Sequence, residues 1–275
     1  MSPALLSLLS LLSLLSPPEV PFEPFRPSPA WSTMRDRIDA LREAALNFDP
    51  EEEAIHAEEG GGWNRDRYET DLPPEPPGEP LRAGSWAAAR AVLTNYEFPD
   101  PRLITGIFVP DDALEGRPML LRARFMGFTF WFGVRVVNVV EEERGEDDER
   151  ARVWGYSYRT LQGHWESGQI TFEVWKWLAS GRVAFRVHAF SRPGLIPNPF
   201  FRFGFRLFGR RLQLRFARTA LERMRRLVAE RLAVGAGGTP EPVETTPVQH
   251  PATVPAAAAE LQAQTGGDEA GRGTP

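Results

Sequence analysis

Apolar residues between positions 103 and 192 are gathered in a series of short runs, with polar sequence between most of them. Six runs there are rich in β-branched and aromatic residues, and turn-like sequence such as PDDALEGRP and EEERGEDDE separates most of them. This pattern is typical of half-buried strands, and short connections between consecutive strands favour an antiparallel meander. The predicted strands cover residues 103–109, 119–128, 128–140, 151–163, 168–178 and 182–192.

Helical spacing of apolar residues marks three further segments. Residues 34–48 and 85–96 are predicted helices, the second with Ser85 as its N-cap. Residues 206–234 form a predicted C-terminal helix, in which we expect Phe216 and Met224 to be buried against the sheet. The sequence therefore predicts an α+β fold with a six-stranded antiparallel sheet and a long C-terminal helix.

One hairpin can be predicted to the residue. A two-residue turn at Ser180-Gly181 would pair Val174 with Val187 and would keep one face of the hairpin apolar. The same register places Glu173 opposite His188, and Trp175 opposite Arg186 with Trp177 beside them.

The two ends of the chain differ in composition from its middle. Residues 1–33 are a Leu/Ser repeat followed by proline-rich sequence, without the basic start of a signal peptide, and residues 235–275 are mostly Gly, Pro, Thr and Ala. We expect both to be disordered and dispensable. Between them we expect a helix and acidic linker at 34–62 and one globular domain at 63–234, whose proline-rich first part, 63–80, wraps the domain without regular structure.

Composition excludes several classes of site. The chain of 275 residues has no cysteine, which excludes disulfides and thiolate sites, and its four histidines are scattered without metal-ligand spacing. We therefore expect no metal and no cofactor. The net charge of −5 argues against non-specific nucleic-acid binding, and no run of residues is long and apolar enough to span a bilayer, so we expect a cytoplasmic protein.

A basic, aromatic segment runs from Phe200 to Phe216. Interleaved phenylalanine and arginine could contact an anionic membrane surface or single-stranded nucleic acid. The favoured alternative is that the phenylalanines close one end of the core and the arginines are solvated.

Two His/Glu pairs are candidates for acid–base chemistry. His164 and Glu166 lie two residues apart at a predicted turn, where a carboxylate could orient a histidine base. The favoured alternative is that Gly163 and Gly168 shape this turn and the two polar side chains cap backbone groups.

Glu173 and His188 form the second pair, on the aromatic face of the predicted hairpin. If that face lines a cavity, Arg186 could receive an anionic group; the alternative is an outer face with a weak ion pair. The residues expected to contact a ligand are Tyr156, Tyr158, Trp175, Trp177, Arg186 and His188.

Several long motifs resemble the DUF1990 family (also called UPF0548), among them WNRDRY, LPPEPPGEP, YRTLQGHWESGQ and HAFSRPGLIPNP. The resemblance covers about residues 63 to 232 and implies no known catalytic residues, because the family is defined by unknown function. More loosely, the order of elements is similar to the helix-grip fold of START/Bet v 1-like proteins. That likeness implies a curved sheet around the C-terminal helix, with an apolar cavity between them.

Two hypotheses for function follow. The first is non-catalytic binding of a small hydrophobic or amphipathic ligand in that cavity. The second is an enzyme that performs acid–base chemistry on a hydrophobic substrate in the same place. The second requires a histidine that points inward.

Overall fold

The computed structural model of the protein describes residues 30–49, 63–125, 127–146, 148–194, 196 and 199–235. They fall within one compact unit, Met1–Glu244, whereas the second unit, Thr245–Pro275, lies outside the described residues, as does most of the predicted extension 1–33. The last part of that extension is helical: α2 spans Ala30–Thr33.

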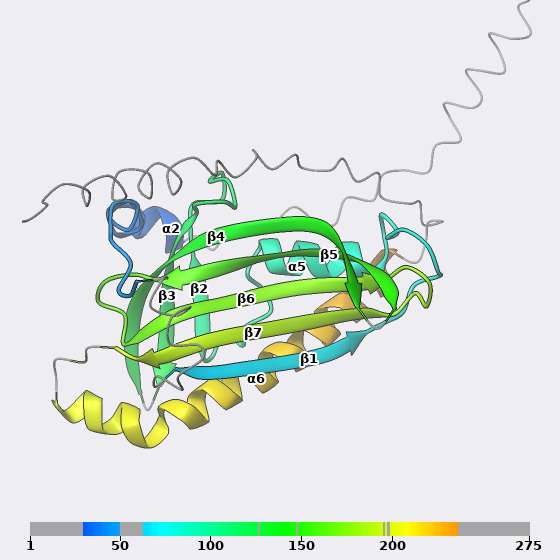
Figure 1. Ribbon diagram of the computed structural model, residues 1–275. Coiled ribbons are helices and arrows are strands. Elements are labelled where there is room, and N and C mark those ends of the chain that lie inside the picture. The colour runs from blue at the N-terminus through cyan, green and yellow to red at the C-terminus, as the bar shows by residue number, and fades with distance from the viewer. Residues whose placement is uncertain are drawn as a thin grey trace, which may run out of the picture. The chain divides into compact units, whose positions relative to one another are not determined.

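A seven-stranded antiparallel sheet forms the centre of the fold (Figure 1). The six predicted strands are present and follow one another as a meander from β2 to β7. The predicted strand count is nevertheless wrong, because residues 63–80 do not only wrap the domain: β1 pairs with β7 and adds a seventh strand. The strands are β1 Asn64–Leu72, β2 Ile104–Ile107, β3 Pro118–Phe125, β4 Phe128–Glu146, β5 Glu149–Thr160, β6 Glu166–Trp177 and β7 Val183–Pro193.

Helices α5 (Ser85–Thr94) and α6 (Pro199–Gly235) cover one face of this sheet (Figure 1). That face carries alternate residues of each strand, including Trp154, Phe172 and Phe185, which are buried with Val92 of α5 and Met224 of α6. The curved sheet on a long C-terminal helix is the arrangement expected from the helix-grip resemblance. We call this the inner face.

The N-terminal segment covers part of the opposite, outer face. Helix α3 (Arg35–Ala40) ends eight residues before the predicted limit, and Ile38 is buried against Ile107 and Leu120. Arg135 of β4 donates to three backbone carbonyls of the segment that follows, those of Leu41, Arg42 and Ala44. These hydrogen bonds hold the segment after α3 in a non-helical path that leads to a β-bridge between Leu46 and Leu161.

A bulge in β4 lets the sheet curve. The register of β4 against β5 shifts between Val137 and Val140, and Asn138 has a positive φ of 52°. Bulges of this kind bend a strand and increase its twist. Beyond it, Glu146 at the end of β4 reaches Arg186 on β7 at 2.6 Å, although two strands separate them in the sheet. The end of the β4–β5 hairpin therefore folds over the outer face.

The hairpin of β6 and β7 has a different register from the predicted one. Phe172 pairs with Val187 and Glu173 with Arg186, an offset of two residues that keeps each side chain on its predicted face. The amide N–H of Trp177 donates to the carbonyl of Arg182, so the connection has four residues rather than two. A two-residue turn of type I′ needs a positive φ at both positions, and of Ser180 and Gly181 only Gly181 has one.

A buried ion pair connects this hairpin to α5. The Nζ of Lys176 lies 2.9 Å from Oε2 of Glu75, and both side chains are almost completely buried. Glu75 also accepts the backbone N–H groups of Leu81 and Trp86, so its carboxylate caps α5. The predicted Ser85 N-cap is wrong: Gly84 holds that position, where a Cβ would lie 2.4 Å from the Glu75 carboxylate.

Replacing Met224 by alanine should destabilise the protein strongly, because the side chain is fully buried against the sheet. We expect a loss of about 2–5 kcal/mol in the free energy of unfolding, measured by denaturant titration. Leu214→Ala on the exposed side of the same helix is the control and should change it by less than about 0.5 kcal/mol. Equal effects would contradict the orientation of α6.

Lys176→Met should leave the Glu75 carboxylate buried without its cation and cost about 3–5 kcal/mol in the free energy of unfolding. The double variant Glu75→Gln/Lys176→Met removes both charges and keeps one amide oxygen as an acceptor for the N–H of Trp86. We expect it to recover much of the loss in the same denaturant titration. A double variant no more stable than Lys176→Met would show that the charge itself is not the cause.

Candidate functional site

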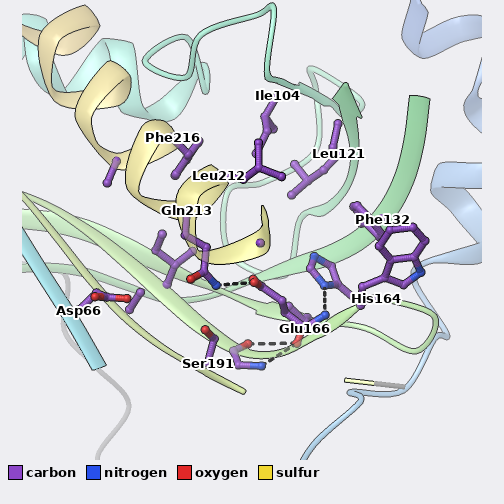
Figure 2. A pocket seen from close by; sticks show the side chains of 18 of the residues that line it. Asp66, Ile104, Leu121, Phe132, His164, Glu166, Ser191, Leu212, Gln213 and Phe216 are labelled. Carbon is purple, nitrogen blue, oxygen red and sulfur yellow. Dashed lines mark hydrogen bonds between the residues drawn. The ribbon is translucent and has the colours of Figure 1, made fainter. Parts of the chain in front are cut away.

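A cavity of about 460 Å³ lies between the inner face of the sheet and α6 (Figure 2). It occupies the end of the sheet where β6 begins and β7 ends, away from α5. Most of its walls are aliphatic or aromatic, and the polar side chains gather at one side. The residues on which the argument depends are Ile104, Leu121, Ala123, Phe132, Tyr158, His164, Glu166, Leu212, Gln213 and Phe216.

His164 reaches the cavity from the β5–β6 turn. Gly163 adopts φ +86° there, and the imidazole Nδ1 accepts the backbone N–H of Glu166 at 3.0 Å. The ring packs on Phe132 with 4.6 Å between ring centroids. Removal from solvent lowers the pKa of His164 to about 4, so the ring is neutral at pH 7. Because Nδ1 is an acceptor, the proton of the neutral ring is on Nε2.

Glu166 is the first residue of β6 and points to the inner face, toward α6 (Figure 2). Its Oε1 accepts a hydrogen bond from the side-chain amide of Gln213. Desolvation raises the pKa of Glu166, an effect that the bond from Gln213 partly offsets. A carboxyl with a raised pKa holds its proton more readily than an exposed one.

Both alternatives for the pair His164 and Glu166 therefore hold in part. The histidine does cap a backbone N–H group of the turn, as the first alternative, a purely structural role, predicted. Both side chains also line the cavity, which a role in acid–base chemistry would require.

A second polar group lines the cavity from β1. Asp66 forms an ion pair with Arg210 of α6, at 2.6 Å between Oδ1 and Nη2. The bond from this arginine lowers the pKa of Asp66, whereas desolvation raises that of the neighbouring Tyr68. Asp66 and Tyr68 were missed because β1 was not predicted.

Asn47, far from this turn in sequence, holds it in place. Its side-chain amide donates to the carbonyl of Glu166 at 2.7 Å, and its Oδ1 accepts the hydroxyl of Thr160 at 2.6 Å. A β-bridge between Leu46 and Leu161 fixes the same segment. The N-terminal segment is therefore part of the support of the site. No signal in the sequence pointed to it.

The two tyrosines expected to contact ligand differ in position. Tyr158 lines the cavity, and its hydroxyl lies 3.4 Å from that of Tyr96. Tyr156 is on the same face but lies in the packed core beside α5, where its hydroxyl donates to the carbonyl of Leu93. Burial raises the pKa of Tyr158 to about 12.

The other expected ligand contacts lie on the outer face, away from the cavity. Trp175 and Trp177 pack with Ala151, Val153 and Ala184. The guanidinium of Arg186 stacks on both indoles, 4.2 and 5.0 Å from their centroids, and its pairing with Glu146 and Glu69 opposes the effect of desolvation and raises its pKa. The expectation that these residues line the cavity is wrong. Side chains alternate between the two faces along a strand, and the positions of Trp175, Trp177 and Arg186 place theirs on the outer face.

The predicted opposition of Glu173 and His188 is also corrected. Thr171 is opposite His188, which leaves a diagonal contact of 3.7 Å between Nε2 of His188 and Oε2 of Glu173. Glu173 instead pairs with Arg144 at 2.7 Å and accepts the indole N–H of Trp175. Desolvation lowers the pKa of His188, which is half-buried on the outer face.

Two further findings concern the described ranges. Their His, Asp and Glu residues form no group of three or more arranged to hold a metal ion. None of the helices within them is both long and apolar enough to cross a bilayer.

The partly buried imidazole of His164 predicts a pH dependence of stability. As the pH falls from about 6.5 to about 4, the unfolded chain binds a proton at this residue before the folded protein does, which lowers the free energy of unfolding by up to about 3 kcal/mol. The raised pKa of Glu166 acts in the opposite direction. His164→Asn retains an acceptor for the Glu166 N–H and should lose less stability over this range in denaturant titrations. Parallel curves for the two proteins would contradict the assignment.

Comparison with known proteins identifies related chains. The profile of the family described as "Domain of unknown function (DUF1990)" matches residues 50–223. No curated protein matches the chain in sequence.

Several solved structures are similar at low identity. Ara h 8.0201 shares 11% identity over 62% of this chain and 99% of its own, with a TM-score of 0.37. The protein TTHA0849 from Thermus thermophilus shares 11% over 61% and 98%, with a TM-score of 0.38. Major latex-like protein 151 from Panax ginseng shares 11% over 62% and 99%, with a TM-score of 0.36.

The family assignment does not depend on these distant structures. The profile match covers more than half of the chain, including the whole sheet and most of α6. The chain belongs to the DUF1990 family.

Proposed function

We propose that this protein binds a small hydrophobic or amphipathic molecule, without catalysis, in the cavity between the sheet and α6. The observation that carries the proposal is a space of about 460 Å³ inside the fold with predominantly apolar walls. Cavities that bind small molecules are of this size and have few polar groups.

The composition of the walls favours a ligand with an apolar body. Leu212 and Phe216 of α6 face Ile104 and Leu121 of the sheet across the cavity (Figure 2). A ligand that removes this surface from water gains roughly 25 cal/mol for each Å² of apolar area that it buries. The polar side chains, gathered at one side, would orient it.

Two aromatic residues mark an entrance. Phe128 and Phe203 line the cavity, yet they are 49% and 65% exposed, so they lie where it meets solvent. Large apolar side chains at such a position favour the capture of an apolar ligand. The structure does not describe most side chains of residues 200–208, the first half of the Phe/Arg segment. The membrane-contact hypothesis for this segment therefore stays a prediction.

An enzyme acting in the same cavity is the second candidate. It is favoured by the position of His164 and Glu166, a base and a carboxyl with shifted pKa values in one cavity. Binding remains the first, because a histidine with a pKa of about 4 is a weak general base near neutral pH. Its Nδ1, moreover, is engaged by the backbone.

Filling the cavity should abolish binding. Ala123 of β3 lines it, whereas Arg124, the next residue, is exposed on the other face of the strand. We expect Ala123→Trp to bind the neutral apolar dye Nile red at least about tenfold more weakly than the wild type, a difference of about 1.4 kcal/mol. Arg124→Trp is the matched control.

The measurement is a fluorescence titration, with thermal unfolding of each variant as a check of the fold. Wild-type affinity in Ala123→Trp, with the fold intact, would show that the dye binds elsewhere. Absence of binding to the wild type would contradict the proposed function.

A further inference from the structure

The cavity has polar groups of an unusual kind for a protein that binds amphipathic molecules. Among the described residues that line it, the acidic ones are Asp66 and Glu166, and none is lysine or arginine. Asp66 is already paired with Arg210. Among these described residues a ligand carboxylate would find no cation to receive it, and burying a carboxylate without one is unfavourable.

A ligand ammonium meets a different obstacle. Its partner would be Glu166, whose Oε1 already accepts a hydrogen bond from Gln213, and taking both charges of such a pair out of water is unfavourable. The nearby acid Asp66 already has Arg210 as its partner. Both charged forms of an amphiphile are thus disfavoured relative to a neutral one.

Two of the polar groups that line the cavity, His164 and Glu166, suit a hydroxyl. Nδ1 of His164 accepts the Glu166 N–H, so Nε2–H is left to donate. Oε1 of Glu166 accepts from Gln213, so Oε2 is left as an acceptor in the ionised form or can carry the proton in the neutral form. A hydroxyl accepts and donates at once, so it can bond to both groups in either protonation state of the carboxyl.

We infer that the cavity selects neutral alcohols, with an apolar body against α6 and the hydroxyl bonded between His164 and Glu166. This inference rests on the proposed function and adds the chemical class of the ligand. Asn47 and Gln213 act as positioning residues, because they hold the turn and the carboxyl from which the two bonds are made.

The test compares three molecules with the same chain: 1-decanol, decanoate and decylamine. Each is used near neutral pH to displace Nile red from the full-length protein. We expect decanol to bind at least about tenfold more tightly than either charged analogue. His164→Asn removes the Nε2–H donor but keeps the acceptor for the turn, and should weaken decanol about tenfold, more than it weakens the decylamine and decanoate controls or the dye.

Glu166→Gln separates charge from shape. It keeps a group that can bond to Gln213 and should reduce the preference for decanol over decanoate, whereas Glu230→Gln on the exposed side of α6 removes the same charge and should leave that preference unchanged. Thermal unfolding confirms that each variant is folded.

The outcomes are distinct. Tighter binding of decanoate or decylamine would overturn the inference and leave the proposed function standing, and so would a preference for decanol that neither site variant alters. Failure of the dye and of all three amphiphiles to bind would overturn both.

Discussion

The buried ion pair of Glu75 and Lys176 determines how the loop before α5, the helix itself and the sheet meet. Removing two charges from water is unfavourable unless their remaining hydrogen-bonding groups are satisfied. Here the ammonium also donates to the carbonyl of Pro76, and the carboxylate accepts two backbone N–H groups. Any other path of the proline-rich loop would leave a buried charge without its partners. The pair thereby specifies one arrangement, and α5 closes one end of the core while the other end is left to the cavity.

The two faces of the sheet use polar residues for different purposes. On the outer face, Arg186 is stacked on tryptophans and bonded to Glu146 and Glu69, so each of these three charges has a partner. The pair with Glu146 also holds the end of the β4–β5 hairpin against the sheet. On the inner face, His164 and Glu166 each keep one hydrogen-bonding atom free of any partner among the described residues. Saturated groups stabilise a fold, whereas unsaturated ones at the wall of a cavity are available to a ligand.

Much of the fold could be predicted from sequence because β-branched and aromatic residues concentrate in buried strands and polar, turn-forming residues separate them. The six strands of the meander were found in this way. β1 was missed because it is an edge strand in which only Leu72 is buried, so its sequence has no run of apolar residues. The predicted register of β6 and β7 was wrong by two residues. The apolar pattern determines which face each side chain is on, but the length of the turn determines which residues are opposite each other. The site was found only in part: His164 and Glu166 were candidates, but their support by Asn47 depends on a contact across more than a hundred residues.

The position of α6 shows where the folding unit ends. The family profile matches residues 50–223, but Met224 and Val228 are fully buried beyond that limit, and so is Ile38 before it. A fragment cut at the limits of the match would expose the inner core at one end and lose Asn47 at the other. The unit that must fold together is thus longer than the segment by which the family is recognised, and a fragment intended for crystallisation or binding studies should run from about the start of α2 to the end of α6.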